Sequence, residues 1–288
     1  MRDQAEKLRD QLRDFSQITY GRTLAVISGK GGVGKSNFSL NFSICLSQKG
    51  YSVLLFDMDI GMGNIDILMG NSSDKNIVDF FQKGMSLEEI ITKGPENVSF
   101  ISGATGLSFI FQMTDHQFLR FQEEFQKVLE KYDYIIFDMG AGISQESSKF
   151  IRCVDDIITI TTPEPTSIMD GYSIIKYITS LKKDIPFFLV CNRVQNEKEG
   201  KETIARLQNA IRKFLQKEIT PLGYIPDNKL VSKAVSRQIP FLLFSPQSDV
   251  SLAIEDITLR YVDRSTEGNL SIRKNNFLGR LKNIFARK

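Results

Sequence analysis

The sequence predicts one α/β domain built on a mostly parallel, doubly wound sheet with helices on both faces. Apolar runs of strand length alternate with helical patterns from Thr23 to about Asp263, which is typical of repeated βαβ units. The runs are apolar throughout rather than at alternate positions, as expected for strands that helices cover on both faces. A glycine-rich segment stands between the first run and the helix that follows it.

Each strand candidate is a short apolar run, and each helix candidate repeats apolar residues at spacings of three and four. The predicted strands span residues 24–28, 53–57, 98–102, 134–138, 156–161, 187–192 and 221–225. The predicted helices between them include residues 115–131, 166–181 and 197–216. We expect the domain itself to span residues 21–263, with a charged arm at residues 1–20 before it and a linker and tail at residues 264–288 after it.

The composition favours an ordinary globular protein in a reducing compartment. Hydrophobic residues make up 41% of the 288 residues, which is enough to build a large core. The three cysteines, Cys45, Cys153 and Cys191, lie far apart and lack metal-ligand spacing. The net charge is only +3, so no specific nucleic-acid partner is expected. No apolar run approaches the roughly 20 residues of a membrane helix, and we expect a cytoplasmic location.

Residues 29–36 read Gly-Lys-Gly-Gly-Val-Gly-Lys-Ser, the GxxxxGK[ST] pattern of a P-loop NTPase. The glycines let backbone N–H groups approach phosphate oxygens, and the dipole of the following helix favours the anion. Lys35 would reach the β- and γ-phosphates, and Ser36 would bind Mg²⁺. The predicted ATP-binding residues here are Gly29, Lys30, Gly31, Gly32, Val33, Gly34, Lys35, Ser36 and Asn37. The alternative is a glycine turn that binds nothing.

Lys30 adds a second lysine to the loop, so the segment also matches the deviant Walker A motif KGGxGK[ST]. Through this motif, and over nearly the whole body of the chain, the sequence resembles the MinD/ParA family of ATPases. The resemblance implies a homodimer with ATP, in which Lys30 reaches the phosphates bound by the other subunit. A cation supplied in this way stabilises the charge of phosphoryl transfer, as an arginine finger does. The alternative is a solvated loop lysine.

Three aspartates that follow predicted strands are candidates for the hydrolytic site. Asp57 and Asp59 stand two residues apart, and an extended chain points both to the same side. The resemblance implies that Asp59 orients the attacking water and that Asp57 lies near Mg²⁺. Asp138 ends another strand and matches Walker B, which implies that it holds Mg²⁺ through a water. Asp57 or Asp59 could instead cap a helix.

The predicted base-binding residues depend mainly on the same resemblance. Asn192 ends a strand, where its side-chain amide can read both donor and acceptor positions of a purine edge. The resemblance implies that Asn192 contacts adenine and that Pro226 and Asp227 approach the base from the other side. All three could instead belong to turns. Adenine is therefore preferred over guanine by resemblance alone.

The C-terminal tail carries a basic amphipathic pattern. One apolar stripe at helical spacing contains Phe277, Leu278, Leu281, Ile284 and Phe285. Such a helix can lie in an anionic membrane surface, and a dimer that presents two tails would bind more strongly. The resemblance implies this use, which would place the protein peripherally at the inner face of the cell membrane. The alternative is a helix that docks on its own body, because both roles need an apolar face.

The N-terminal arm contains Asp3-Gln-Ala-Glu-Lys-Leu-Arg9, which matches the DQAxxLR pattern of a flagellar branch of the family. The match implies a role in flagellar number or placement, with flagellar basal-body components as further partners. It also implies that the arm stimulates the signal-recognition-type GTPase FlhF. The predicted partner-activating residues are Gln4, Leu8 and Arg9. The alternative is a solvated helical extension.

Together these patterns predict an ATPase that dimerises with Mg·ATP, associates with the membrane and slowly hydrolyses ATP to ADP and phosphate. The predicted catalytic residues are Lys30, Lys35 and Asp59. A ParA-type DNA-segregation ATPase is one alternative, which the amphipathic tail disfavours. A nucleotide-binding adaptor that does not hydrolyse ATP is the other, which the lysines and aspartates of the site disfavour.

Overall fold

The computed structural model describes residues 20–58, 65–71, 73–103, 114–142, 144–182, 184–267 and 277–285. Strands and helices alternate along most of this length. The elements are β1 (Arg22–Ile27), α2 (Lys35–Gln48), β2 (Val53–Met58), α3 (Ile65–Met69), α4 (Ile77–Gln82), α5 (Leu87–Ile90), β3 (Thr92–Lys93), the 3₁₀ turn η1 (Pro95–Asn97), β4 (Ser99–Ile101), α7 (Asp115–Lys131), β5 (Tyr134–Met139), α8 (Gln145–Ile151), β6 (Asp156–Thr161), α9 (Pro165–Leu181), β7 (Phe187–Val194), α10 (Glu197–Leu215), β8 (Thr220–Pro226), α11 (Lys229–Ser236), α12 (Phe241–Phe244), α13 (Asp249–Glu267) and α14 (Phe277–Phe285).

In the described residues, one eight-stranded sheet has the order β3-β4-β2-β5-β1-β6-β7-β8. Neighbouring strands are parallel except β3, which pairs antiparallel with β4. The first strand lies between β5 and β6, so the chain winds to one side of β1 and then to the other. In such a sheet, a ligand binds at the carboxyl ends of the strands near the point where the winding reverses. The predicted fold class is confirmed.

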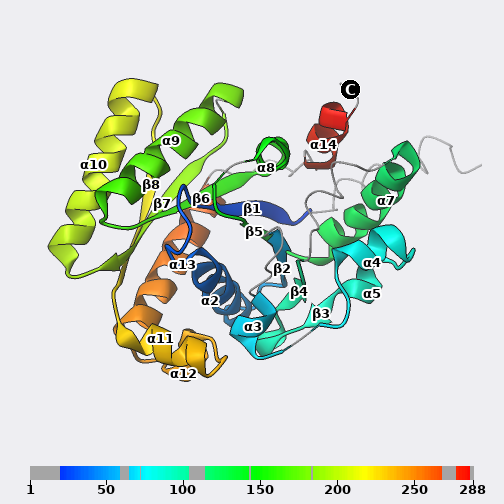
Figure 1. The fold of residues 1–288 in the computed structure, drawn as a ribbon, viewed down its shortest axis with the longest axis horizontal. Helices are drawn as coiled ribbons and strands as arrows, with labels where there is room; N and C mark the ends of the chain where they lie inside the picture. The colour runs from blue at the N-terminus through cyan, green and yellow to red at the C-terminus, as the bar shows by residue number, and fades with distance from the viewer. Residues whose placement is uncertain are drawn as a thin grey trace, which may run out of the picture.

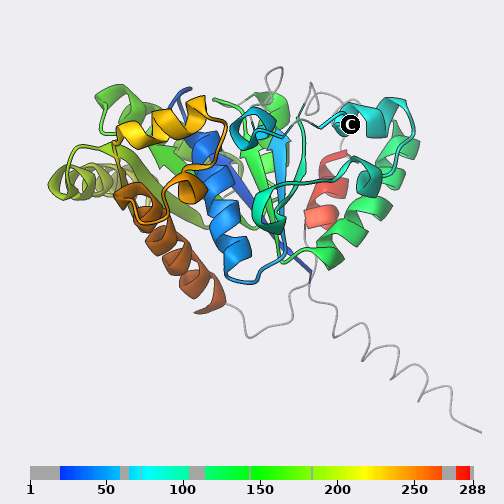
Figure 2. The same ribbon diagram turned by 90° about the horizontal axis from the view of Figure 1, so that it is seen from below.

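Helices cover both faces of the sheet, as Figure 1 shows. Buried residues of α7, α8, α9, α10 and α14 belong to one hydrophobic cluster. Those of α2, α3, α11, α12 and α13 belong to a second cluster on the other face. Figure 2 shows the same layers from below, with α2 and α13 in front of the sheet. Because both faces are buried, the strands are apolar at successive positions, as the sequence indicated.

Each of the seven predicted strands is present, with ends that differ by at most two residues from those expected. The sequence pattern missed β3, which is only two residues long. It also missed the short helices, since four to eight residues are too few to show a clear helical period. The predicted end of the domain at Asp263 lies inside α13, which continues to Glu267.

The tail helix α14 packs into the core between α7 and α8. Phe277, Leu278 and Leu281 are 1%, 4% and 0% exposed. The Phe277 ring lies 5.8 Å from the Phe137 ring of β5 and 5.4 Å from the Phe150 ring of α8, measured between centroids. Figure 1 shows α14 beside α8 on this face of the sheet. The tail is therefore part of the folded body in this structure.

This docking bears on two arrangements of the tail that the sequence left open. The apolar stripe was predicted to face a membrane, but its first three residues are buried against the body, and Ile284 is partly buried there. The side chain of Phe285 lies outside the described residues. The alternative of a body-docked helix is the arrangement that the structure shows. No helix in the described part of the chain is long and apolar enough to cross a bilayer.

A buried ionic cluster joins β1, β6 and α13 at the amino-terminal edge of the sheet. The guanidinium of Arg22 donates to Asp156, including an Nη2–Oδ1 bond of 2.9 Å, and the Tyr261 hydroxyl donates to Asp156 Oδ2 at 2.8 Å. The carboxylate is fully buried. Burial, with the nearby charge of Asp156, raises the pKa of the Tyr261 phenol, so the hydroxyl keeps its proton and remains a donor.

We expect Arg22→Met to lower the free energy of unfolding by about 3–5 kcal/mol, because it leaves the Asp156 carboxylate buried without its cation. Chemical denaturation monitored by circular dichroism would measure the loss. Arg212→Met is a suitable control, since its pair with Glu218 is exposed on both sides and should cost no more than about 1 kcal/mol. Equal losses in the two variants would contradict the assigned importance of the buried cluster.

Candidate functional site

The predicted phosphate loop connects β1 to α2, and close contacts explain two of its glycines. A Cβ atom at Gly29 would lie 2.3 Å from the backbone carbonyl carbon of Asp170 in α9. Gly34 has a φ of +91°, and a Cβ atom there would lie 2.4 Å from the Asn192 Nδ2 atom. Glycine at these positions lets the loop pass between α9 and the end of β7.

Lys35 lies under the loop and meets the predicted Walker B carboxylate. Its Nζ atom donates to Asp138 Oδ1 over 3.2 Å, and both side chains are buried. The Ser39 hydroxyl, one turn further along α2, donates to the same oxygen at 2.9 Å. A buried lysine is stabilised only with an anionic partner, and here that partner is Asp138. Bound phosphates would supply further negative charge to the same ammonium group.

The residues predicted to hold Mg²⁺ fit a hard cation. Asp138 Oδ2 is buried and has no hydrogen-bond partner in the described part of the chain. Asp57 lies directly opposite Asp138 in the parallel pair of β2 and β5, so the two carboxylates end neighbouring strands. Ser36, which is half-buried, begins α2 on the other side of the loop. Two carboxylates and a hydroxyl are oxygen donors of the kind that Mg²⁺ prefers, and water and phosphate complete such sites.

Lys30 is held on the outside of the loop by its own chain. Its Nζ atom lies 2.7 Å from Glu164 Oε2 and 3.5 Å from the Thr166 hydroxyl. Both members of the ion pair are substantially exposed, at 44% and 60% of their side chains. The hydrogen bond from Lys30 lowers the pKa of the Glu164 carboxyl. Because water competes for both partners, this pair can exchange for another anion at little cost.

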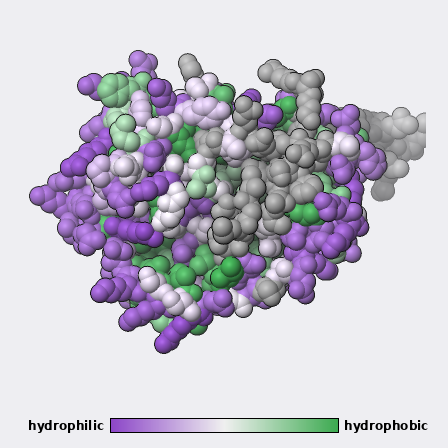
Figure 3. All heavy atoms as spheres, in the orientation of Figure 1, coloured by the Kyte–Doolittle hydropathy of each residue, from purple (hydrophilic) through white to green (hydrophobic). Residues whose placement is uncertain are grey.

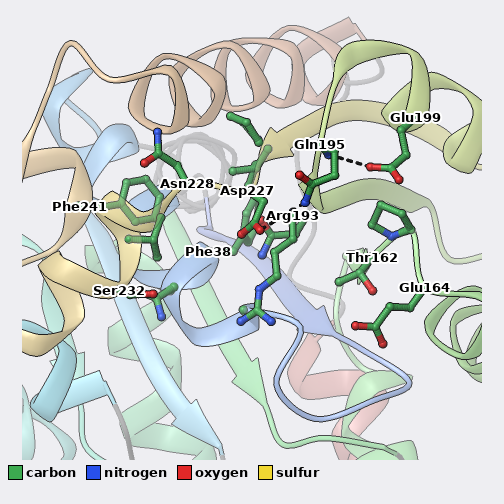
Figure 4. Close-up of a pocket in the computed structure, with 17 residues that line it drawn as sticks. Phe38, Thr162, Glu164, Arg193, Gln195, Glu199, Asp227, Asn228, Ser232 and Phe241 are labelled. Atoms are coloured by element: carbon green, nitrogen blue, oxygen red, sulfur yellow. Dashed lines mark hydrogen bonds between the residues drawn. The ribbon is translucent and has the colours of Figure 1, made fainter.

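A cavity of about 660 Å³ opens beside the loop at the carboxyl ends of β6, β7 and β8. Its size is within the range of small-molecule sites. Figure 4 shows side chains from these strand ends, with Phe38 of α2 and Phe241 of α12, around the hollow. Of the residues predicted to bind the nucleotide, the cavity is lined by Gly34, Asn37, Asn192, Pro226 and Asp227. The structure thus brings the proposed phosphate and base positions together.

Asn192 makes a contact with the loop that the sequence did not reveal. Its Nδ2 atom donates to the Val33 carbonyl of the loop at 2.7 Å, and its Oδ1 atom accepts from the Arg193 backbone N–H at 2.9 Å. The side chain therefore ties the end of β7 to the phosphate loop. One amide hydrogen on Nδ2 and one lone pair on Oδ1 are still available for a base edge.

Sequence reasoning missed several residues around the cavity. Gln195 donates its backbone N–H to Glu199 Oε2 at 2.7 Å, and its side-chain amide lies 3.4 Å from Asp227 Oδ2. Figure 4 shows this group and Arg193 at the mouth of the cavity. Ser39 and Glu164 were also missed. Ser39 could have been found, because it lies four residues after Lys35 on the same helical face.

Some predicted site residues lie outside the described part of the chain. These are Asp59 in the predicted water-orienting position and Gln4, Leu8 and Arg9 in the predicted activating arm. Within the described residues, no group of three or more histidine, cysteine or acidic side chains could hold a metal ion. A Mg²⁺ site here would therefore depend on Asp57, Asp138, Ser36 and the nucleotide itself.

Residues 24–241 match the CobQ/CobB/MinD/ParA nucleotide binding domain. Among characterised relatives, the flagellum site-determining protein YlxH of Helicobacter pylori is 35% identical over 266 residues, covering 92% of this chain and 88% of that protein. The antiactivator FleN of Pseudomonas aeruginosa is 29% identical over 236 residues, covering 82% and 84%. Each alignment thus covers most of this chain and most of the relative.

Solved structures show the same fold. The septum site-determining protein MinD from Pyrococcus horikoshii, solved with Mg-ADP, aligns with a TM-score of 0.70 at 21% identity, covering 87% of this chain and 100% of that one. A ParA family ATPase from Chlorobium tepidum aligns with a TM-score of 0.67 at 22% identity, covering 83% and 98%. At this level of identity the likeness concerns the fold alone.

We expect Asn192→Ala to weaken the binding of ADP and of inorganic tripolyphosphate to a similar extent, about tenfold, because it releases the loop from β7. Calorimetric titration with both ligands would measure the change. Gln195→Ala, which lines the same cavity without touching the loop, should affect only ADP. If Asn192→Ala weakens ADP and leaves tripolyphosphate unchanged, the residue acts through the base and the loop contact is unimportant.

Proposed function

Because the chain belongs to the CobQ/CobB/MinD/ParA nucleotide-binding family, we propose that it is an ATP-driven switch of the FlhG type that regulates flagellar number or placement. The observation that carries the proposal is the buried contact of Lys35 with Asp138 beneath a loop that also carries Lys30. The flagellar assignment is supported by the relative from Helicobacter pylori, which is a flagellum site-determining protein. In this role the protein binds ATP, dimerises and hydrolyses ATP slowly to reset the switch.

The residues of the site have distinct tasks in the proposed hydrolysis. Lys35 neutralises the β- and γ-phosphates from below, while the loop N–H groups and the start of α2 hold the phosphate oxygens. Asp59 orients the attacking water, an assignment made from the sequence. Lys30 leaves Glu164 and reaches the phosphates of the partner subunit, where its charge stabilises the transition state. The weak hold of Glu164 on Lys30 suits this exchange.

Asp57, Asp138 and Ser36 would hold Mg²⁺ at the phosphates. When bound, the ion neutralises charge on the β- and γ-phosphate oxygens during transfer. The orphaned Asp138 Oδ2 supports the assignment, since a buried carboxylate oxygen without a donor is costly unless a water or cation completes it. Lys35 then moves its hydrogen bond from Asp138 to the phosphates.

The proposed dimer uses the face that carries the loop. Ile67 of α3 and Ile239 before α12 are 53% and 39% exposed, and Gly70 allows α3 to approach the backbone of Gln238 closely. Hydrophobic spheres gather on the lower part of the face shown in Figure 3. Exposed apolar side chains beside a nucleotide site are suited to a protein interface, because a partner would remove them from water.

Membrane association is the second part of the proposal, and the docked tail sets a condition on it. Phe277, Leu278 and Leu281 cannot enter a bilayer while they pack against the body. Binding to an anionic membrane therefore requires α14 to leave its site, and lipid would replace the lost core contacts.

The arm at residues 1–20 completes the proposal as the activator of an FlhF-type GTPase, with Gln4, Leu8 and Arg9 as its contact residues.

We expect Lys35→Met to abolish ATP binding, because the phosphates lose the point charge beneath the loop. Lys30→Met should retain ATP binding but lose at least about 100-fold in hydrolysis rate, since the charge supplied to the partner is missing. Calorimetry measures ATP binding and steady-state phosphate release measures hydrolysis, so together they distinguish the two variants. Hydrolysis by Lys30→Met at the parent rate would contradict the role of Lys30 in trans, and ATP binding by Lys35→Met would overturn the site itself.

We expect Phe277→Glu to remove binding to anionic vesicles, because it places a charge in the apolar stripe. Asp155→Asn should have the opposite effect and raise vesicle binding several-fold, since it removes the negative charge that lies 2.5 Å from Arg280 and helps to hold the docked tail. Glu218→Gln is the matched control, because it makes the same charge change at an exposed pair away from the tail. Co-sedimentation that does not distinguish Asp155→Asn from Glu218→Gln would contradict the release of α14.

A further inference from the structure

A basic pocket lies where the docked tail meets the body, away from the nucleotide site. Its volume is about 450 Å³. Its walls come from α8 and the residue after it, from the end of α9, and from α14. The lining residues are Lys149, Arg152, Leu181, Lys182, Arg280, Asn283 and Ile284. We call this site the basic pocket.

The basic pocket gathers positive charge without a matching acid in its described lining. Arg280 donates through Nε to the Cys153 carbonyl at 2.7 Å and through Nη2 to Asp155 at 2.5 Å. Lys182 donates to the Arg152 carbonyl at 3.0 Å, which uses one of its three N–H hydrogens. Arg152 contributes a further half-buried guanidinium. Donor hydrogens therefore remain on Arg280 and Lys182 for a ligand.

The electrostatics of the pocket favour an anion. Burial and then the charge of Arg280 lower the pKa of Lys182, and the nearby Asp155 and Asp184 oppose this shift only in part. Burial raises the pKa of the neighbouring Cys153 thiol, and the charges of Arg280, Lys182 and Arg152 each lower it. A phosphate group offers several acceptor oxygens and pairs well with guanidinium groups, so it would offset these charges.

We propose that the basic pocket binds a phosphate group and that the bound phosphate bridges the body and the docked tail. Arg152 and Lys182 come from the body, whereas Arg280 and Asn283 come from α14, so the ligand contacts both. The apolar side chains of Leu181 and Ile284 at the same site would lie against a glycerol or similar carbon group next to the phosphate. By linkage, a ligand that binds only the docked arrangement stabilises it. This inference goes beyond the proposed ATPase switch and does not depend on it.

The test uses the full chain with and without Mg·ADP, since binding that is the same in both conditions does not take place in the phosphate loop. Glycerol 3-phosphate is titrated by calorimetry, and hydrogen exchange of residues 277–285 is followed in the same series. Vesicles of phosphatidylglycerol, with vesicles of phosphatidylcholine as reference, test whether the phosphate group that binds belongs to a lipid. The variant is Arg152→Gln with Lys182→Gln. The control is Lys176→Gln with Lys213→Gln, which removes the same charge from exposed positions on α9 and α10.

We expect glycerol 3-phosphate to bind and to slow exchange of the α14 amides several-fold, with at least about tenfold weaker binding in the variant and none of this loss in the control. That result identifies a soluble compound as the source of the bound phosphate group. Binding of phosphatidylglycerol vesicles alone, lost in the variant and kept in the control, identifies a lipid headgroup. Absence of both, or equal losses in variant and control, would overturn the proposal.

Discussion

The contact between Lys35 and Asp138 is the constraint on which the site depends. It exists because β1 lies between β5 and β6 in register, so the loop after β1 begins α2 directly beside the end of β5. A buried ammonium and carboxylate are costly to desolvate, and their pairing with the Ser39 hydroxyl offsets part of this cost. A nucleotide and its cation would bind the donors and acceptors that this pair leaves unused. The pair is therefore better suited to a binding site than to a purely structural role.

The phosphate loop is held from two sides, and this makes it a preformed site. Gly29 lies against α9, and Gly34 lies against Asn192 at the end of β7, so the loop cannot move without disturbing both elements. Such preorganisation lowers the entropic cost of binding. Lys30 differs, because only an exposed pair with Glu164 restrains it. The same loop therefore combines a fixed backbone with one side chain, Lys30, that is free to bind another anion.

The observed docking of the tail uses the same apolar residues that the proposed membrane association would need. Its apolar stripe satisfies the rule that an amphipathic helix must bury one face, and here the body supplies the partner. The contacts of Arg280 with Cys153 and Asp155 fix the helix at the loop before β6. Because that loop also bonds to Thr23 of β1, tail docking and the central strand share one set of polar contacts.

The sequence by itself determined the fold class, the strands and the phosphate loop, because continuous apolar runs and the glycine and lysine spacing of residues 29–36 carry that information locally. It left the tail undecided, since an apolar stripe has the same pattern whether it faces lipid or a protein core. Only the tertiary structure placed Phe277 among the rings of α7, β5 and α8, and Asn192 against the loop. These contacts join residues more than 100 positions apart, and no local pattern encodes which distant partner the fold will bring to them.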